Sequence, residues 1–508
     1  MAYKRTILLL LVNLVLCDSQ FQDVFAEIRR IFNIGGVQGE RSEFSEEYDF
    51  IIIGAGSGGS VVANRLTENP EWSVLLLEAG REESFLTDVP LMASLQSATA
   101  YNWGYKSQKL NTACLGLIDG RCNLVRGKAL GGTSVINFLL NTRGNRLDFD
   151  TWANSGNEGW SYKDVLPYFI KSENCTLCKD VDSEFHGQNG YLNIEHPGYE
   201  SPMVKLFLKA GQDLGYRNND PNGAFGLGFS RVQATMKNGR RCSASKAFLQ
   251  PVSNRHNLHI STESRVIKIL IEQDTKRAYG VEFLKNRKKF TVRSKKEVIL
   301  SAGALNSPHL LMLSGVGPRD VLKNAKIPLI EDLKVGYNLQ DHMAMSTLAF
   351  LVNKSVTVSD LTVQNPTDIY NYLARGKQNH SYYCNHKKYI RKAVSVATSD
   401  RFKKYNSTLN PIPFPGCEHI HFASDDYWAC AVRHVSTTLG HHVGTCKMGP
   451  RSDPEAVVDP QLKVYGIEGL RVVDGSVMPN IVAGHTNAVI YMIGEKASDF
   501  IKNTWRNK

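Results

Sequence analysis

A short, mostly apolar run opens the first patterned segment of the chain. Residues 48–53 read YDFIII, and the run stops at Gly54. A short, β-branched apolar run that ends at glycine is typical of a strand buried on both faces of a parallel sheet. Residues 60–66 follow as a small-residue amphipathic helix, and residues 73–77 (SVLLL) read as the next buried strand. The pattern therefore predicts a strand–helix–strand unit of the kind that builds doubly wound α/β domains.

The loop inside this unit carries glycines at the spacing of a dinucleotide-binding turn. It reads GAGSGG, which places Gly54, Gly56 and Gly59 in a G-x-G-x-x-G pattern. Gly54 permits the tight turn, Gly56 lets the backbone approach a pyrophosphate, and Gly59 allows close helix-to-strand packing. The helix N-terminus offers N–H groups to the anion. Glu78 ends the second strand, where its carboxylate can accept hydrogen bonds from a ribose.

The alternative without a ligand is a glycine-rich turn that joins two buried strands. The order strand, loop, helix, strand, acid within about thirty residues favours a dinucleotide over that alternative. An acid at the end of the second strand suits both NAD and FAD, so this unit does not distinguish the two nucleotides.

Two later segments extend the pattern. Residues 127–137 read GKALGGTSVIN, a glycine-rich loop with small hydroxyl residues that can lie flat against a large planar ligand. Taken alone, it could equally be a flexible turn. Residues 298–302 form a β-like run, and residues 303–317 (GALNSPHLLMLSGVG) read as a turn and an apolar helix that ends at glycine. The second segment predicts another α/β crossover.

Composition narrows the class of protein. The chain has 508 residues, too many for a single hydrophobic core, and its 42% apolar and 21% charged residues are close to the globular average. A disordered or fibrous protein is excluded. The net charge is +11, but the basic residues are scattered in short groups such as 287–289. A nucleic-acid partner is therefore not expected.

The N-terminus predicts export. Lys4 and Arg5 precede an apolar run over residues 7–16, which is about half the length that a bilayer span needs. We interpret residues 1–19 as a signal peptide and expect a secreted, extracellular protein. No later segment reaches 18 consecutive apolar residues, so no transmembrane anchor is expected.

Secretion makes oxidised cysteines and glycans expected features. Nine cysteines remain after Cys17 is discounted, so at least one stays unpaired within the chain. Two pairs lie close in sequence and are candidate loop-closing bridges, Cys114 with Cys122 and Cys417 with Cys430, although spacing does not fix connectivity. Four Asn-x-Ser/Thr sequons are present, at Asn174, Asn353, Asn379 and Asn406.

Six segments taken together resemble the glucose/methanol/choline (GMC) flavin oxidoreductases. Besides the GAGSGG, GKALGGTSVIN and GALNSPHLLMLSGVG segments, they are NLQDH at 338–342, HHVGTCKMG at 441–449 and DGSVMPNIVAGHTNA at 474–488. The segments occur in family order over nearly the whole mature chain. PGCEH at 415–419 and YWACAVRH at 427–434 resemble the secreted insect glucose-dehydrogenase-like branch of the family.

The resemblance implies an α/β fold with a discontinuous, Rossmann-like FAD-binding domain and an interleaved α+β substrate domain built on an antiparallel sheet. The FAD-binding domain would comprise residues 46–145, 228–335 and 456–508, and the substrate domain residues 146–227 and 336–455. The second substrate part is expected to be shortened, because the chain between about Arg375 and Gln378 skips residues that relatives use for strands of this sheet.

The cofactor implied is FAD. In relatives with covalent flavin the attached histidine occupies the position of Ile136, so FAD should be bound non-covalently here. No metal is expected. The resemblance and the glycine pattern together give these cofactor-binding residues: Gly54, Ala55, Gly56, Ser57, Gly58, Gly59, Glu78, Ala79, Gly127, Gly131, Gly132, Thr133, Asn137, Val266, Ala302, Gly303, Asp474 and Gly475.

Histidine is the side chain best matched to accepting a hydroxyl proton near neutral pH. Alignment with the family's His-x-Val-Gly-Thr makes His441 the general base, and a register shift of one residue would make it His442. Asn487 maps to the group that helps to bind the substrate oxygen. An extended backbone would point His485 to the same face as Asn487, so His485 can contribute instead or as well.

The reaction implied is oxidation of an alcohol CH–OH group, on a sugar- or steroid-like substrate, by hydride transfer to flavin N5. A quinone or oxygen would then accept the electrons. Two alternatives keep the fold: a secreted flavin-binding protein without turnover, and a lyase that retains FAD without net redox chemistry. A plain NAD enzyme is the least supported, because the later loops have no place in one.

Overall fold

The structure is a computed structural model that describes residues 43–177, 181–345, 348–354 and 387–506. The predicted signal peptide and the predicted shortening near residues 375–378 lie outside these ranges. Within them, no helix is both long enough and apolar enough to cross a bilayer.

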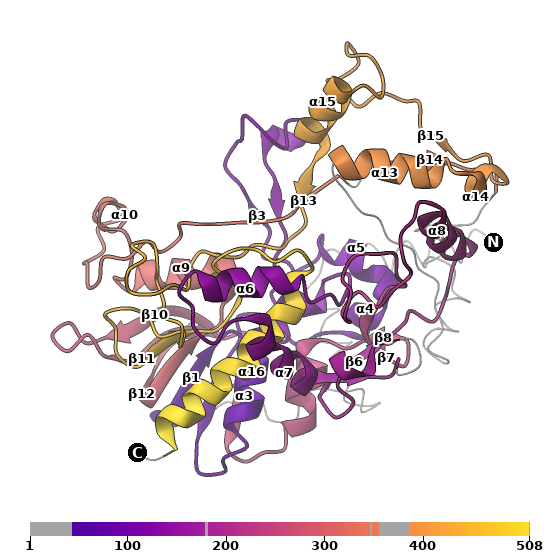
Figure 1. Cartoon of the computed structure of the whole chain (residues 1–508). Helices are drawn as coiled ribbons and strands as arrows, with labels where there is room; N and C mark the ends of the chain where they lie inside the picture. The colour runs from indigo at the N-terminus through magenta and orange to yellow at the C-terminus, as the bar shows by residue number, and fades with distance from the viewer. Residues whose placement is uncertain (1–42, 178–180, 346–347, 355–386, 507–508) are drawn as a thin grey trace, which may run out of the picture.

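A seven-stranded sheet forms the centre of the larger part of the molecule (Figure 1). Its path runs β10–β11–β12–β1–β2–β9, with β17 paired to β12. The strands are β1 (Glu47–Ile53), β2 (Val74–Leu77), β9 (Leu258–Ser261), β10 (Arg265–Ile271), β11 (Ala278–Lys285), β12 (Lys288–Leu300) and β17 (Leu470–Val472). These strands come from all three sequence ranges expected to build the FAD-binding domain.

The parallel half of this sheet contains the predicted strands. Strand β1 runs parallel to β2 and to the C-terminal half of β12, with Ile53 opposite both Leu77 and Leu300. Residues Phe50–Ile53 are at most 3% exposed, which explains the continuous apolar run. The N-terminal half of β12 pairs antiparallel with β11, and β11 pairs antiparallel with β10.

Two helices from opposite ends of the chain cover the parallel strands together. Helix α3 (Ser57–Leu66) follows β1, and helix α16 (Thr486–Trp505) crosses in front of it (Figure 1). A Cβ atom on Gly494 would lie 2.9 Å from the Cβ atom of Val61, so glycine lets the two helices approach closely. Helix α9 (Gly303–Leu313) follows β12 as the predicted second crossover.

A second sheet has the antiparallel character expected of a substrate domain. It has the order β5 (Glu173–Cys175), β6 (Leu192–Glu195), β7 (Ala234–Lys237) and β8 (Arg240–Arg241). Strands β6, β7 and β8 are antiparallel, whereas β5 joins β6 in parallel. The mixed α/β fold class is thereby confirmed. Strands β7 and β8 fall within residues 228–335, expected in the FAD-binding domain, yet they pair with this second sheet.

Short helices and two-residue ladders form the remainder of the described structure. The helices are α4 (Phe85–Asp88), α5 (Ala93–Gln96), α6 (Arg146–Asn154), α7 (Tyr162–Ser172), α8 (Pro202–Asp213), α10 (Arg319–Asn324), α13 (Lys387–Ala397), α14 (Asp400–Lys403) and α15 (Asp425–Val435). The ladders are β3 (Tyr105–Lys106) with β4 (Asn123–Leu124), β13 (Met343–Ala344) with β16 (Thr437–Thr438), and β14 (Phe350–Leu351) with β15 (Thr408–Leu409). Helices α13 and α15 lie above the main sheet in Figure 1.

Both candidate disulfides are confirmed. Cys114 is bonded to Cys122 and Cys417 to Cys430. Three further cysteines of the described ranges are buried and outside disulfides, namely Cys175, Cys242 and Cys446. Cys178 and Cys384 lie outside the described residues.

A buried ion network links β5 to the loops that precede β6 and β7. The His186 ring lies 3.0 Å from Glu173 Oε1 through Nδ1 and 2.9 Å from Asp220 Oδ2 through Nε2. Arg143 Nη2 donates to the other oxygen of Glu173 at 2.5 Å. Burial alone would lower the pKa of His186, but hydrogen bonds with Asp220, Cys175 and Glu173 outweigh it and raise the pKa to about 11.

We expect His186→Ala to lower the free energy of unfolding by about 3–5 kcal/mol, because it leaves the buried carboxylate of Asp220 without its cation and leaves Glu173 with Arg143 alone. Since the folded-state pKa is raised, the proton-linked part of this stabilisation is complete below the ordinary value near 6.5 and declines as the pH rises toward 11. Urea unfolding at pH 6 and pH 9 measures both effects. His309→Ala, on the exposed surface of α9, is the control. An equal loss in both variants, or a loss independent of pH, would contradict this role.

Candidate active site

The first glycine loop is packed so tightly that two of its positions accept only glycine. Gly54 has a φ of +97°, and a Cβ atom there would lie 2.5 Å from the carbonyl oxygen of Ser301. A Cβ atom on Gly59 would lie 2.0 Å from the carbonyl oxygen of Gly54. The tight turn and the close helix packing inferred from the sequence are therefore both present.

Gly56 differs from its neighbours because it faces open space. It is the N-cap of α3, and a Cβ atom on it would meet no protein atom within 4 Å. Helix α3 begins at Ser57, so the N–H groups of its first turn lie beside this space. An anion would be favoured there by the N–H groups and by the helix dipole.

Glu78 lies at the C-terminal end of β2, next to the glycine loop. Its carboxylate is buried and accepts the N–H groups of Ala55 at 2.9 Å and Gly80 at 2.7 Å. Burial raises the pKa of Glu78 to about 7, although these backbone hydrogen bonds oppose the shift. A carboxylate has about four lone-pair sites, so it retains capacity for the hydroxyls of a ribose. Ala79 follows in the same turn.

The second glycine loop lies directly on the first. The N–H of Gly131 donates to the carbonyl oxygen of Ala55 at 2.8 Å, and a Cβ atom on Gly132 would lie 2.7 Å from Cα of Gly56. The N–H of Gly127 donates to the Thr133 hydroxyl at 3.1 Å. Two loops separated by about seventy residues thus form one wall.

Arg241 holds the end of the second loop. Its Nη1 group donates to the carbonyl oxygen of Ser134 at 2.9 Å and to Oδ1 of Asn137 at 2.8 Å. The carboxamide of Asn137 is therefore fixed by the protein itself. Ile136, at the position of the covalently attached histidine of some relatives, is 4% exposed and is packed with Ala129 and Val135.

Asp474 joins two more of the predicted segments. Its carboxylate accepts the N–H of Gly303 at 2.8 Å, the hydroxyl of Ser307 at 2.5 Å and the N–H of Ser476 at 2.8 Å. Gly303 has a φ of +85° and also faces open space. The remaining predicted cofactor residues are placed in β10 (Val266), before α9 (Ala302), in α3 (Gly58) and in the turn after Asp474 (Gly475).

These residues fit an FAD molecule. The helix N-terminus suits a pyrophosphate, Glu78 suits a ribose, and the open space beside Gly56 leaves room for the nucleotide to approach.

Three histidines form a continuous chain of imidazoles. Nε2 of His441 lies 3.0 Å from Nδ1 of His485, and Nδ1 of His441 lies 2.9 Å from Nδ1 of His342. Each pair of rings meets edge-on. His342 closes the NLQDH segment, which contributed to the family resemblance without any residue in it being given a role. No pattern in the sequence shows that His342 and His441 meet, because the fold brings them together across 99 positions.

The structure places His485, and not Asn487, beside His441. Helix α16 begins at Thr486, so His485 is its N-cap and Asn487 lies in its first turn. The extended backbone that would point both side chains to one face is therefore absent. Oδ1 of Asn487 instead accepts the hydroxyl of Ser57, in the first turn of α3, at 2.6 Å.

His442 lies beside the chain of imidazoles but outside it. It is 3% exposed, and its Nε2 lies 3.4 Å from Oδ2 of Asp341. The other oxygen of Asp341 accepts the backbone N–H of His441 at 2.8 Å. Of the two histidines in the HHVGT segment, His441 is therefore the one that contacts His342 and His485.

Burial favours the neutral form of His441, His442 and His485. It lowers the pKa of His441 to about 2, of His442 to about 3 and of His485 to about 4. For His441, the neighbouring His485 and His342 lower the pKa further. The half-buried Arg126, which donates to the carbonyl oxygen of Gly440, also lowers the pKa values of His441 and His442. The arrangement offers neutral imidazole nitrogens, the form that acts as a base or as a hydrogen-bond acceptor.

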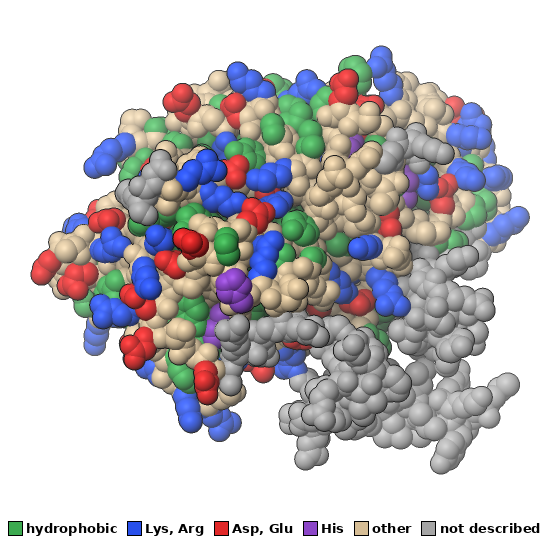
Figure 2. All heavy atoms as spheres, turned by 90° about the horizontal axis from the view of Figure 1, so that it is seen from below, with side chains coloured by type: hydrophobic (Ala, Val, Ile, Leu, Met, Phe, Trp, Pro, Cys, Tyr) green, Lys and Arg blue, Asp and Glu red, His purple; other side chains and the backbone are tan. Residues whose placement is uncertain are grey.

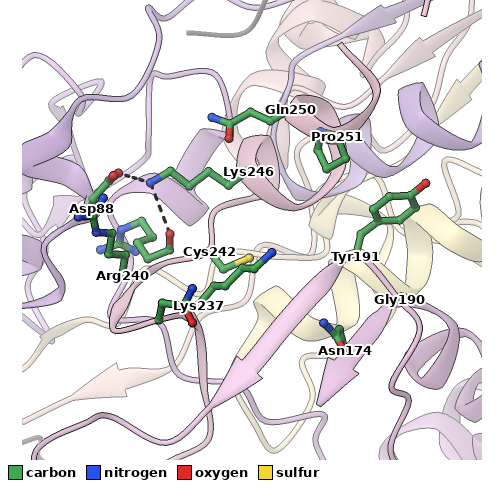
Figure 3. Close-up of a pocket in the computed structure, with 12 residues that line it drawn as sticks. Asp88, Asn174, Gly190, Tyr191, Lys237, Arg240, Cys242, Lys246, Gln250 and Pro251 are labelled. Carbon is green, nitrogen blue, oxygen red and sulfur yellow. Dashed lines mark hydrogen bonds and ion pairs between the residues drawn. The ribbon is translucent and has the colours of Figure 1, made fainter. Parts of the chain in front are cut away.

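A separate hollow of about 650 Å³ lies on the side of the second sheet (Figure 3). Its wall includes Lys237, Arg240 and Lys246, and Lys246 forms ion pairs with Asp88 and Glu83. None of the clustered histidines lines it. On the face shown in Figure 2, basic and acidic side chains are interspersed.

Comparison with known proteins decides the family. Family models described as GMC oxidoreductase match residues 48–344 and 362–494. The chain belongs to the GMC oxidoreductase family. The chain is 37% identical over 557 positions to glucose dehydrogenase [FAD, quinone] of Drosophila melanogaster, covering 92% of this chain and 89% of that protein. It is 33% identical to human mitochondrial choline dehydrogenase, covering 91% of each.

Two solved structures of other proteins share the fold. An FAD-dependent oxidoreductase from Chaetomium thermophilum has a TM-score of 0.79 at 25% identity, covering 90% of this chain and 100% of that one. Formate oxidase of Aspergillus oryzae has a TM-score of 0.80 at 22% identity, covering 92% of this chain and 100% of that one. As a GMC oxidoreductase, the chain is an FAD-dependent oxidoreductase, as the sequence predicted.

The alignment with the fly enzyme also shows a difference in length between the two chains. Its 557 aligned positions exceed the 508 residues of this chain, so the relative contains residues that this chain lacks. Their position near residues 375–378 stays a prediction.

Proposed function

We propose that this chain is a secreted FAD-dependent dehydrogenase that oxidises a CH–OH group of a sugar- or steroid-like alcohol, with His441 as general base. The observation that carries the proposal is the placement of the first residues of α16. His485 contacts His441, and Asn487 contacts Ser57 of the nucleotide turn. The imidazole chain therefore adjoins the site that fits FAD.

The proposed chemistry divides the work between two imidazoles. The neutral His441 accepts the proton of the substrate hydroxyl at Nε2, and His485 hydrogen-bonds the substrate oxygen. Asn487, the group that the resemblance put in this role, supports the first turn of α3 instead. When bound, FAD supplies the acceptor for the hydride that leaves the alcohol carbon. We propose a quinone as the final acceptor, because the fly relative is named for FAD and quinone.

The low pKa of His441 gives a pH prediction. A base that is already neutral at pH 6.5 does not lose activity there, so we expect the limiting rate of flavin reduction to be flat from pH 7.5 to 5.5. The contribution of His441, His442 and His485 to the free energy of unfolding should fall in the same range, because these histidines bind protons below pH 6.5 in the unfolded chain but not in the folded protein. His186 and Glu78, whose pKa values are raised, contribute in the opposite direction. Stopped-flow absorbance measures the rate of flavin reduction, and urea unfolding measures the free energy of unfolding. A rate that halves near pH 6.5 would show that His441 titrates as it does in water.

Two features support secretion, the disulfides and the exposed sequons. The described chain holds two disulfides, which persist in oxidising compartments. Asn353 and Asn406 are exposed and can carry glycans, whereas Asn174 is half-buried in β5 and donates to Asn193. Asn379 lies outside the described residues. Peptide mapping of the protein by mass spectrometry, before and after glycan removal, should show glycans at Asn353 and Asn406. Retention of an unglycosylated protein inside expressing cells would contradict secretion.

Anaerobic mixing with alcohols tests the function. Purified protein is mixed with sugars, simple alcohols and ecdysteroid-like sterols while the flavin absorbance is followed, and a quinone or air is then admitted. We expect one class of alcohol to bleach the flavin and a quinone to restore its colour.

A second candidate function is a flavin-binding protein without turnover. It is supported by the residues that the fly enzyme contains and this chain lacks. An incompletely covered site would admit water to the reduced flavin. A stable flavin spectrum that no member of the panel bleaches would favour this candidate.

A further inference from the structure

The chain of imidazoles continues beyond the pair that the proposed reaction uses. His441 has one ring nitrogen toward His485 and the other toward His342. A neutral imidazole carries one N–H donor and one acceptor nitrogen, so the two contacts of His441 cannot both be donated or both be accepted. Only two arrangements of the protons are possible along the chain.

In the first arrangement His342 donates to His441, and His441 donates to His485. Nε2 of His441 then carries a hydrogen and cannot accept the hydroxyl proton of a substrate. In the second arrangement Nδ1–H of His441 donates to Nδ1 of His342. Nε2 of His441 then carries no hydrogen and accepts the Nδ1–H of His485, and it can act as a base when a substrate hydroxyl lies between these two nitrogens.

We propose that His342 is a positioning residue whose Nδ1 accepts the Nδ1–H of His441 and thereby keeps Nε2 of His441 unprotonated. The inference rests on the proposed function, since it assumes that His441 is the base. The partner on the second nitrogen of a histidine sets which nitrogen carries the hydrogen, and a wrong tautomer removes a base without disturbing its position.

The other polar groups beside His441 do not accept its Nδ1–H in place of His342. The carboxylate of Asp341 lies beside His441, but its Oδ1 accepts the backbone N–H of His441, and its Oδ2 lies 3.4 Å from Nε2 of His442. Arg126 carries a positive charge and offers no acceptor. The backbone also fixes His342, because its carbonyl oxygen accepts the N–H of Leu439, two residues before His441.

Three substitutions separate the tautomer role from other roles. Asparagine places an acceptor oxygen near the position of Nδ1, so His342→Asn preserves the hydrogen bond but cannot carry a proton onward. His342→Gln places its oxygen farther out, near the position of Nε2. His342→Phe keeps a ring of similar shape and removes the acceptor. We expect flavin reduction within about 3-fold of wild type in His342→Asn, and slower by about 10-fold or more in the other two.

The decisive readout does not depend on turnover. Long-range ¹H–¹⁵N correlation spectra of ¹⁵N-histidine-labelled, flavin-containing protein distinguish Nδ1–H from Nε2–H tautomers. We expect His441 to carry its hydrogen on Nδ1 in wild type and in His342→Asn, and to lose this preference in His342→Phe. An Nε2–H resonance for His441 in wild type, or a His342→Asn variant as slow as His342→Phe, would overturn the proposal. If no alcohol reduces wild-type flavin, the proposed function fails, while the spectra still decide the tautomer.

Discussion

Replacing His441 with alanine leaves a folded, yellow protein whose flavin is reduced by alcohol at least about 10²-fold more slowly. The loss follows from removal of the base that accepts the hydroxyl proton. The contacts of His441 are to two other imidazoles and to Asp341, not to the glycine loops, so FAD binding should persist. Single-turnover, anaerobic stopped-flow measurement of flavin absorbance isolates this step from reoxidation.

His442→Gln is the matched control. It changes the adjacent buried histidine, the alternative base if the motif is shifted by one residue. We expect its reduction rate to stay within about 10-fold of wild type, below the loss typical of a missing general base. Unchanged reduction in His441→Ala together with a large loss in His442→Gln would transfer the base to His442.

Gly56→Val yields a stable protein that has lost about 10²-fold in affinity for FAD. A Cβ atom at Gly56 would meet no protein atom within 4 Å, so we expect the apoprotein to accommodate the side chain. The same side chain would overlap a pyrophosphate lying against the turn, and overpacking of this kind costs roughly 1–3 kcal/mol. Fluorescence titration of apoprotein with FAD measures the affinity, and thermal unfolding of the apoprotein measures stability.

Substitutions at two other glycines serve as controls for this result. Gly198→Val also enters open space, remote from the loop, and should change neither quantity. Gly59→Val would bring a side chain to within 2.0 Å of a backbone oxygen and should abolish folding, not only binding. Full FAD affinity in Gly56→Val would mean that the nucleotide does not pass this turn.

The sequence predicted the parts of the fold that depend on local patterns. The strands at 48–53 and 73–77 could be predicted from the sequence, because a strand buried on both faces consists mainly of apolar residues. Strand β12 was only half predicted, from residue 298. Its N-terminal half has exposed lysines and arginines alternating with inward residues, so it lacks the apolar run. The helix predicted over 60–66 begins three residues earlier, at Ser57. Its first turn contains Gly58 and Gly59, which the sequence pattern had assigned to the loop.

The site was predictable where residues are neighbours in sequence and not where the fold alone joins them. Glu78 lies beside the glycine loop because a βαβ unit brings the strand end there. The direction of the Asn487 side chain depends on the residue at which α16 begins. Because α16 begins at Thr486, Asn487 lies in its first turn, where its side chain contacts Ser57. Helix boundaries are the least certain part of a pattern-based prediction. His342 reaches His441 through tertiary packing, which leaves no periodic signal in either segment.

The central claim is that FAD is held non-covalently between the two glycine loops, with an imidazole chain at its reacting end. The most direct test is the visible spectrum of the protein purified from its native source, recorded before and after acid precipitation. The account predicts a flavin spectrum in the intact protein and all of the pigment in the supernatant after precipitation, since Ile136 offers no attachment. A colourless protein with no affinity for added FAD, or pigment that stays with the precipitate, would contradict it.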